Sequence, residues 1–377
     1  MSAHFALTLR VCTRSATYAQ PRREDLRHTR NLGVSTWGAQ YGGSRTLETV
    51  RRLALCSLLL AAATVACTGD GPAVEDPTST SGASASPTSD PPTSPSATPS
   101  ASPSVSPSVR PVRFDSAAAL ADVRLLAGEI GPRLTTEPAF REGAAVVERR
   151  FREYGYQVRR QPFAVPAGDS WGVPVDAGRS FNVVATPRGF DAAEPHVIVG
   201  AHLDTVAVAP GAEDNASGVA VLLELARLAS EDRTRVPAVL IAFGGEEPRG
   251  DGDDLHHFGS QHYVRTMPPA QRDALHAMMS LDRVGVGSFV PVCTGPLSPH
   301  WVRDSVLAAA ERQDIPARTC ELTTSDHWAF EKAGFAVTRL GSIDYPEYHS
   351  ADDLPGVVDR WQLARTGRLA WSWLSAR

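Results

Sequence analysis

From residue 112 onwards, short apolar runs alternate with longer segments in which apolar residues recur every three or four positions. The runs are typical of strands buried on both faces, and the longer segments of helices with one buried face. The predicted strands and extended segments are 156–165, 180–185, 197–201, 236–243, 277–281, 288–293, 317–322 and 336–340. The predicted helices are 116–129, 140–154, 216–229, 260–266, 301–312, 326–333 and 357–374. This alternation predicts an α/β fold, a single domain whose mostly parallel central sheet is flanked by helices.

The residues before this domain show a different pattern. Residues 50–67 read VRRLALCSLLLAAATVAC, in which two arginines precede an apolar stretch and small residues lead to Cys67. This is the pattern of a secretory signal peptide, and it resembles a bacterial lipoprotein signal with Cys67 as the lipidated residue. A plain signal peptide and an uncleaved membrane anchor are the alternatives. The apolar stretch is shorter than the roughly 20 residues that a spanning helix needs, which favours a signal.

The segments on either side of this signal are predicted to lack structure. Residues 1–49 have no apolar periodicity and precede the signal, so we expect a non-native or disordered leader, with translation beginning near Val50. Residues 68–111 are mostly Ser, Pro, Thr, Ala and Gly, which cannot bury enough apolar surface to fold and therefore form a linker. We therefore expect a domain, residues 112–377, that is secreted or tethered to the outer face of a bacterial membrane.

Charge and cysteine content bear on nucleic-acid binding, disulfide formation and metal binding by sulfur. The formal net charge is -5 and the arginines are scattered among acidic residues, so we expect no nucleic-acid partner. Cys12, Cys56 and Cys67 precede the domain, which itself contains Cys293 and Cys320. In an exported protein these two could form a disulfide, and two separate buried thiols would fit equally well. No cysteine spacing indicates a metal site that uses sulfur.

Side chains with metal-binding chemistry follow three apolar strands. His202 and Asp204 come after the run 197–201, and Glu246 and Glu247 follow the run 236–243 through two glycines. Asp282 comes directly after the run 277–281. Because functional residues in a parallel sheet gather beyond the carboxyl ends of the strands, we expect these side chains to converge.

Two more residues complete the constellation. Asp214 precedes the predicted helix 216–229, and His349 lies in a polar loop near the end of the chain. Taken singly, each of these side chains has a structural explanation, such as a helix cap or a solvated turn. Taken together, two histidines and three carboxylates suit two divalent, zinc-like ions that share one carboxylate. Two adjacent Glu at a strand exit point in different directions, so one can bind metal while the other acts as general base in amide hydrolysis.

The domain resembles the co-catalytic dizinc aminopeptidase family of clan MH. Six motifs occur in the order of that family, namely GAHLDTV, PGAEDNASG, the Glu-Glu pair, LDRVG, SDHWAF and YHSADD. The resemblance implies a mixed sheet between helices, two zinc ions as cofactors and peptides as substrates. It also implies that N-terminal residues are released through attack by a hydroxide that bridges the two metals.

The resemblance assigns a role to each matching residue. The implied metal ligands are His202, Asp214, Glu247, Asp282 and His349. Asp214 would bridge both ions, His202 and Asp282 would complete one zinc site, and Glu247 and His349 would complete the other. Glu246 would be the general base.

Further residues are expected to support these ligands. Asp204 would hold the second ring nitrogen of His202, and Asp353 is placed to do the same for His349. His327 is expected either to contact the substrate or to be structural. Asn215 and Ser217 are expected to cap the helix that follows Asp214.

One loop departs from the family pattern. The stretch PRGDGDDLHHF after Glu247 is long and rich in Asp and His. His256 and His257 could be ligands, but a solvated loop at the edge of the substrate cleft is the favoured interpretation.

Three alternatives differ in function. A glutaminyl cyclase shares the scaffold but uses one zinc and not the full five-ligand set. A non-catalytic ectodomain would have lost ligands or the base, and none is lost here. A related metallopeptidase with a dimerisation lid would need more residues between Glu247 and His349. We therefore expect a zinc aminopeptidase that acts as a monomer.

Overall fold

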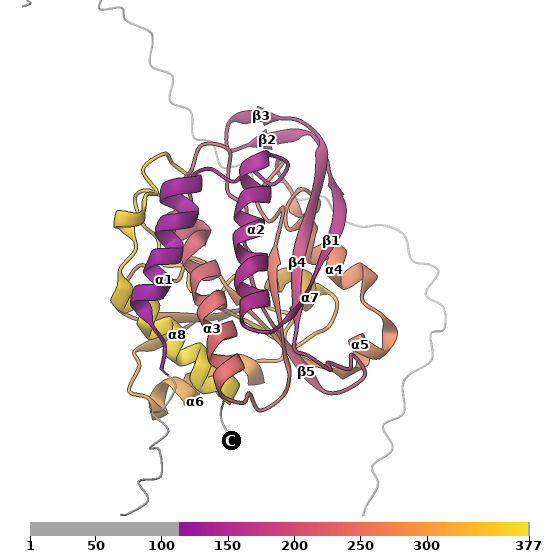
Figure 1. Cartoon of the computed structure of the whole chain (residues 1–377), viewed down its shortest axis with the longest axis vertical. Helices are drawn as coiled ribbons and strands as arrows, with labels where there is room; N and C mark the ends of the chain where they lie inside the picture. Colours follow the sequence, from indigo (N-terminus) through magenta and orange to yellow (C-terminus); the bar gives the residue numbers. More distant parts are fainter. Residues whose placement is uncertain (1–112, 376–377) are drawn as a thin grey trace, which may run out of the picture. The chain divides into compact units, whose positions relative to one another are not determined.

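The computed structural model of the chain describes residues 113–375 (Figure 1). The predicted leader 1–49, signal peptide 50–67 and linker 68–111 lie outside the described residues and stay predictions. Among the described helices, none is both long and apolar enough to cross a membrane.

An eight-stranded mixed sheet forms the centre of the domain, with the strand order β1-β4-β6-β5-β7-β10-β8-β9 (Figure 1). Parallel pairing joins β6, β5, β7 and β10 in succession, and also joins β8 to β9. The pairs β1–β4, β4–β6 and β10–β8 are antiparallel. The strands of the sheet are β1 Gln157–Val165, β4 Gly178–Thr186, β5 His196–His202, β6 Ala238–Phe243, β7 Leu275–Leu281, β8 Val290–Thr294, β9 Ala317–Glu321 and β10 Val337–Leu340. The predicted fold class is confirmed.

Helices cover both faces of this sheet, and the side-chain alternation of the strands divides the core in two. Val197 and Val199 of β5 pack with α1, α2, α3, α6 and α8 in one apolar cluster. Ile198, which points to the opposite face, packs with α4 and α7 in a second cluster. The helices are α1 Ser116–Val123, α2 Pro138–Glu153, α3 Gly218–Glu231, α4 Phe258–Thr266, α5 Pro269–Ala274, α6 Trp301–Arg312, α7 His327–Lys332 and α8 Arg360–Ser375. Burial on both faces explains why β5 and β6 have no polar face.

The central strands approach one another closely at Gly200. A Cβ atom at this position would lie 2.3 Å from the ring of Phe243 on the neighbouring strand β6. Glycine at this point therefore lets the ring of Phe243 pack against the backbone of β5.

Local differences from the predicted elements have simple causes. A two-stranded hairpin, β2 Gly168–Ser170 with β3 Val173–Val175, was not predicted because each strand is only three residues long. The predicted helix 357–374 begins instead at Arg360, because Pro355–Val357 forms a separate 3₁₀ turn. The predicted helix 116–129 is α-helical to Val123 and continues as a wider π-type segment, Arg124–Ile130.

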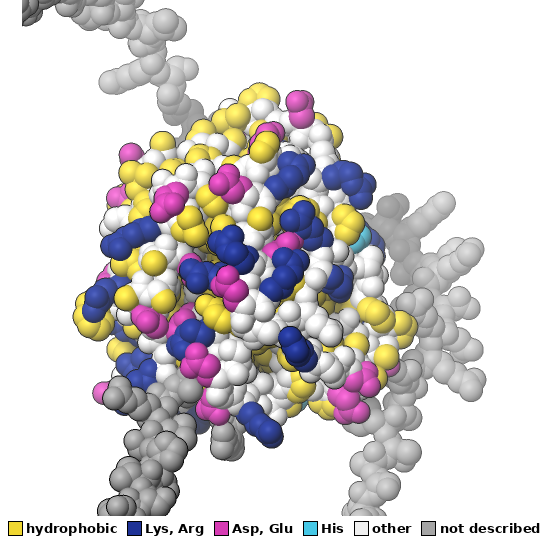
Figure 2. Space-filling model, viewed as in Figure 1, with side chains coloured by type: hydrophobic (Ala, Val, Ile, Leu, Met, Phe, Trp, Pro, Cys, Tyr) yellow, Lys and Arg dark blue, Asp and Glu magenta, His cyan; other side chains and the backbone are white. Residues whose placement is uncertain are grey.

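Charged side chains of both signs are interspersed on the face that carries α1, α2 and α3 (Figure 2). Arg150 of α2 lies 2.8 Å from Asp122 of α1, and Arg227 of α3 lies 2.8 Å from Glu231 one turn later. The first of these pairs joins two helices of the same layer, and the second supports α3 itself.

Cys293 and Cys320 form a disulfide, with their Cα atoms 4.4 Å apart. The two residues are register partners on the parallel strands β8 and β9, so the bond fastens the edge strand to the sheet. The sequence had left a disulfide and two free thiols as equal alternatives.

We predict that replacing both cysteines by serine lowers the free energy of unfolding by about 2–4 kcal/mol. The reason is that the bond spans 27 residues and restricts the unfolded chain. Guanidinium unfolding monitored by far-UV circular dichroism measures the difference, and wild type kept in reductant should match the double variant. Equal stability of the oxidised and reduced proteins would contradict the prediction.

Candidate metal centre and active site

Three adjacent parallel strands deliver their polar residues to one edge of the sheet. β5 ends at His202, β6 ends one turn before Glu246 and Glu247, and β7 ends immediately before Asp282. Asp214 comes from the irregular segment Ala212–Ser217 that precedes α3, where its backbone is non-helical. His349 comes from the loop after β10. The structure therefore brings together all five residues that the sequence singled out as ligands.

The carboxylate of Asp214 lies between the two histidines. Its Oδ1 is 3.1 Å from Nε2 of His202, and its Oδ2 is 3.3 Å from Nε2 of His349. Nε2 of His202 is also 3.5 Å from Oδ1 of Asp282, and Nε2 of His349 is 3.3 Å from Oε2 of Glu247. Three three-residue groups result, each with its ligand atoms within 4.8 Å of one another, and two of them share Asp214. The third group consists of His202, Glu246 and Glu247.

This donor set fits divalent cations. All five side chains are at most 6% exposed. Nε2 of His202, Oε1 of Glu247 and Oδ1 of Asp282 are buried without a hydrogen-bond partner among the described residues. Buried polar atoms normally have partners, and imidazole nitrogens with carboxylate oxygens are ligands that zinc prefers. The arrangement thus suits two zinc ions, one in each of the two groups that share Asp214.

The pKa values of the clustered histidines and glutamates are shifted by burial and by the neighbouring charges. Burial by itself would lower the pKa of His349, but the carboxylates of Glu247 and Asp214 outweigh burial and raise this pKa to about 10. The pKa of His202 is also raised, because Glu246, Asp214 and Asp282 oppose the effect of burial. Burial raises the pKa of Glu246 to about 8 and that of Glu247 to about 7. Without cations, therefore, protons are drawn into the cluster.

Arg339, which the sequence analysis missed, compensates one of the ligands. Its Nη2 lies 2.9 Å from Oδ2 of Asp282, and the whole side chain is inaccessible to solvent. Nη1 donates to the carbonyl oxygen of Thr324 at 2.9 Å. Burial would raise the pKa of Asp282, but Arg339 and His202 hold it well below its usual range. A charged residue inside the apolar run AVTRL was the available signal, because an arginine in a buried strand needs a partner.

Asp204 has a different contact from the predicted one. Its carboxylate accepts the backbone N–H groups of Glu246 at 3.1 Å and Glu247 at 3.3 Å. Nδ1 of His202 is instead 3.2 Å from the backbone carbonyl oxygen of Asp204. The prediction that this carboxylate holds the His202 ring was therefore wrong, because two unpaired amides of the Glu-Glu turn compete for it. Asp204 orients the turn that presents the general-base candidate.

The prediction for Asp353 was wrong in the same way. Its oxygens accept the backbone N–H groups of Glu213 at 2.9 Å and Asp214 at 3.1 Å, and the hydroxyl of Tyr345 at 3.0 Å. Nδ1 of His349 has no partner among the described residues. Asp353 follows His349 by four residues, and this closeness in sequence favoured a contact with its ring. In the structure the carboxylate instead points toward the segment that carries Asp214.

Three other polar residues hold the same segment in place. Arg133 is fully buried and donates to the carbonyl oxygens of Leu203 at 3.0 Å and Gly211 at 3.0 Å. Asn215 accepts the N–H of Gly218 at 2.9 Å and so caps α3, as predicted. Ser217 was also expected to cap this helix, but its hydroxyl donates to the carbonyl oxygen of Glu213 instead.

Three further histidines, His256, His257 and His327, were considered in the sequence analysis, and they differ in exposure and contacts. His327 is fully buried and its Nε2 is 2.8 Å from the carbonyl oxygen of Leu322, so of its two predicted roles the structural one holds. Its pKa is lowered to about 3, by burial and by the charge of Arg339. His256 is partly exposed and lines the cleft. His257, by contrast, is only 4% exposed, so the expectation of a solvated loop was wrong for this residue.

A cleft of about 490 Å³ opens beside the cluster. Glu246, Glu247 and His349 line it, together with three aromatic side chains. The aromatic residues are Trp171, Trp328 and Tyr348. Trp171, at the tip of the β2–β3 hairpin, lies edge-on to His349 with 4.4 Å between ring centroids. A substrate in this cleft would contact both Glu246 and the metal ligands.

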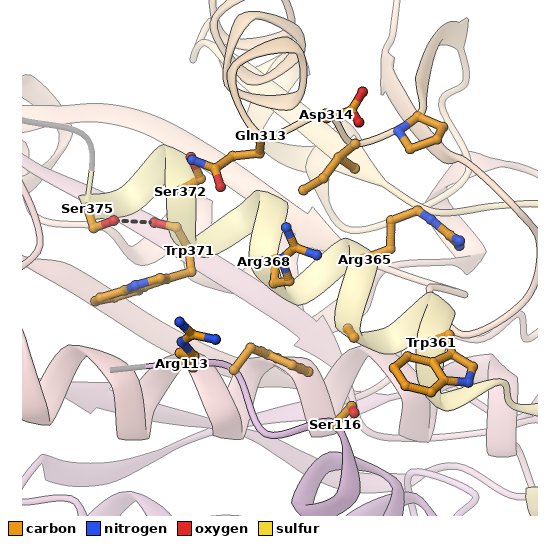
Figure 3. Close-up of a pocket in the computed structure, with 14 residues that line it drawn as sticks. Arg113, Ser116, Gln313, Asp314, Trp361, Arg365, Arg368, Trp371, Ser372 and Ser375 are labelled. Carbon is orange, nitrogen blue, oxygen red and sulfur yellow. Dashed lines mark hydrogen bonds between the residues drawn. The ribbon is translucent and has the colours of Figure 1, made fainter. Parts of the chain in front are cut away.

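A larger hollow of about 1000 Å³ lies elsewhere, between the start of the described chain and α8 (Figure 3). Arg113, Arg365, Arg368, Trp361 and Trp371 are among its lining residues. Among the described residues that line it there is no histidine, and Asp314 supplies their only carboxylate. It therefore lacks the donors that the metal chemistry requires.

An α/β sheet with two overlapping His/carboxylate groups at its strand ends is the architecture of zinc peptidases. A sequence model of peptidase family M28 matches residues 182–374, slightly more than half of the chain. The chain belongs to peptidase family M28.

Two relatives share sequence with part of this chain. Aminopeptidase YwaD of Bacillus subtilis is 30% identical over an alignment of 204 positions, which covers 50% of this chain and 43% of YwaD. The uncharacterized protein YfbL of Escherichia coli is 29% identical over an alignment of 227 positions, which covers 51% of this chain and 70% of YfbL. The chain thus spans less than half the length of YwaD.

The solved structures show the fold. BSAP, a zinc aminopeptidase from Bacillus subtilis, superposes with a TM-score of 0.62 at 19% identity, covering 70% of this chain and 95% of BSAP. A glutaminyl cyclase from Bacteroides thetaiotaomicron gives a TM-score of 0.60 at 20% identity, covering 71% of this chain and 100% of the cyclase. Because both enzymes share the fold, the fold does not choose between their reactions.

We predict that Arg339→Met destabilises the metal-free protein by about 3–5 kcal/mol, because it removes the nearest positive charge from the buried carboxylate of Asp282 and leaves only the more distant His202 and Arg283. Urea unfolding after dialysis against a chelator measures the effect. Arg149→Met is the matched control, because Arg149 pairs with Glu153 and both side chains are more than half exposed, so its loss should cost less than about 1 kcal/mol. Equal stability of the two variants would show that the Arg339 pair contributes no more than a surface pair.

Proposed function

We propose that this chain is a dizinc aminopeptidase that removes N-terminal residues from peptides. The observation that carries the proposal is the carboxylate of Asp214, which faces one histidine with each oxygen and belongs to both ligand groups. In this proposal His202, Asp214 and Asp282 hold one zinc ion, and Asp214, Glu247 and His349 hold the other. Bound zinc supplies Lewis acidity that polarises the scissile carbonyl and lowers the pKa of water.

Glu246 is the residue that moves protons in this proposal. It lines the cleft, and its Oε2 is 4.0 Å from Nε2 of His202, outside hydrogen-bond distance. Its carboxylate would accept a proton from the attacking water and then donate it to the leaving amine. Asp204 supports this role because it binds the backbone amides of both Glu246 and Glu247. The base and its neighbouring ligand are thereby fixed as one unit.

The aminopeptidase specificity rests on the relatives and on the shape of the cleft. Aminopeptidase YwaD is among the relatives, although this chain spans only part of its length. The cleft of about 490 Å³ has room for one large side chain and the adjoining peptide bond, with Trp171, Trp328 and Tyr348 around it. The second candidate is a glutaminyl cyclase, which the shared fold supports and which would use one zinc ion.

We further propose that the domain acts outside the cytoplasm. The signal pattern of residues 50–67 and the Ser/Pro/Thr-rich stretch 68–111 support a secreted or lipid-anchored protein, with Cys67 as the anchored residue. The disulfide between Cys293 and Cys320 agrees with an oxidising compartment. A single tethered copy of the domain is the assembly that we propose.

We predict that Glu246→Gln lowers kcat for peptide hydrolysis by about 100- to 10,000-fold and leaves the zinc content unchanged. The amide keeps the size of the side chain but cannot accept the proton. Turnover of free-amine dipeptides and elemental analysis of the same sample measure both quantities. The neighbouring substitution Glu247→Gln is the control, because it should lose zinc as well as activity. Normal hydrolysis by the Glu246→Gln variant would remove this residue as the base.

We predict that the purified protein binds two zinc ions per chain and loses activity when a chelator removes them. Zinc or cobalt added back should restore hydrolysis, because the ligands remain in place. Peptides with a free N-terminus should be cleaved and N-blocked copies of the same peptides should not. A single bound ion, together with cyclisation of N-terminal glutamine, would instead establish the cyclase.

A further inference from the structure

His257 is held against the Glu-Glu turn by its own backbone. Its N–H donates to the carbonyl oxygen of Glu246 at 2.9 Å, and the N–H of Phe258 donates to the carbonyl oxygen of Gly245 at 2.7 Å. His257 has a left-handed backbone with φ at 56°, just before α4. This conformation is uncommon for residues other than glycine, although histidine adopts it more often than most. The imidazole is therefore presented to Glu246 by a fixed turn and not by a free loop.

The ring of His257 lies next to the candidate base. Its Nε2 is 3.2 Å from Oε1 of Glu246, and the side chain is buried. The other oxygen of Glu246, Oε2, is directed to the ligand cluster, 4.0 Å from Nε2 of His202. Among the described residues, His257 and His202 are the only basic side chains within 4.0 Å of this carboxylate. The charge of Glu246 also raises the pKa of the buried Asp326, a carboxylate that can repel Glu246 but cannot donate to it when ionised.

The chemistry of the ring suits a donor at Nε2. Burial lowers the pKa of His257, although Asp326 and Asp253 oppose this, and a lower pKa favours the neutral ring, which carries one N–H. A carboxylate oxygen is an acceptor, so the nitrogen that faces it must carry the proton. Nδ1 is then the unprotonated nitrogen, and it has no partner among the described residues.

We propose that His257 is a positioning residue for Glu246, donating from Nε2–H to Oε1 so that Oε2 stays turned toward the ligand cluster and the cleft. This inference rests on the proposed role of Glu246 as general base. The oxygen that exchanges protons is then the one that no other side chain occupies. The hydrogen bond from His257 would keep the Glu246 carboxylate oriented, because a carboxylate free to rotate would spend much of its time turned away from the attacking water.

A second histidine far from the site allows a matched experiment on the full chain loaded with zinc. His257→Leu removes the donor, His257→Gln keeps a donor of similar reach, and His276→Ala alters an exposed histidine at the start of β7, at the end of that strand opposite to the ligands. We expect His257→Leu to lower kcat by about 10- to 100-fold, with KM and zinc content within about twofold of wild type. We expect His257→Gln to recover most of this loss and His276→Ala to behave as wild type.

Three results would overturn the proposal. These are an unchanged kcat in His257→Leu, an equal loss of kcat in the Leu and Gln variants, or a loss of zinc from both variants, which would show a structural role. A wild-type protein that binds zinc but cleaves no peptide would instead contradict the proposed function.

A measurement on the wild type keeps the inference testable without turnover. Nitrogen-15 NMR of histidine-labelled protein reports which ring nitrogen carries the proton, and the His257 signal is assigned by its absence from His257→Gln. We expect the Nε2–H form. The Nδ1–H form would overturn the proposal, because Nε2 could not then donate to Glu246.

Discussion

The carboxylate of Asp214, shared between two imidazoles, is the interaction on which the rest of the site depends. Each of its oxygens faces a different histidine, so a single side chain couples the two ligand groups. Carboxylates packed this closely repel one another, and burial adds a desolvation penalty. The architecture around Asp214 supplies compensation: Arg339 neutralises Asp282, and Arg133 and backbone amides hold the neighbouring loops. Bound cations would complete this compensation.

Around the metal centre, several buried carboxylates accept hydrogen bonds from backbone amides of the ligand-bearing loops. Asp204 fixes the amides of the Glu-Glu turn, Asp353 fixes the amides of Glu213 and Asp214, and Glu213 accepts the N–H of Gly285. These three carboxylates connect the loops after β5, β6, β7 and β10 into one frame. Because each tie involves a peptide group, the positions of the ligands follow from the loop backbones, and rotation of a single side chain does not release them.

The sequence was sufficient for the fold class and for the convergence of the ligands. Apolar runs without a polar face indicated buried parallel strands, and the residues after those runs, such as His202 and Asp282, had to meet at one edge. The direction in which a loop side chain points was not predictable, because a carboxylate close to a histidine in sequence can accept from its ring or from backbone amides of another loop. Asp204 and Asp353 both turned to backbone amides. Arg339 was missed because its partner, Asp282, lies far away in the sequence. His257 was placed in a solvated loop because a polar loop sequence does not show which of its side chains is buried.

The tie between Asp353 and the segment of Asp214 has a consequence for biosynthesis. Residues 213 and 214 wait for a partner about 140 positions later in the chain, and His349 belongs to the same late loop. Because domains generally fold as units, an unfinished polypeptide has the first ligands but not the last. Under the proposed function, a nascent copy that has not yet reached Asp353 would lack both His349 and the carboxylate that holds the segment of Asp214, and it would not hydrolyse peptides.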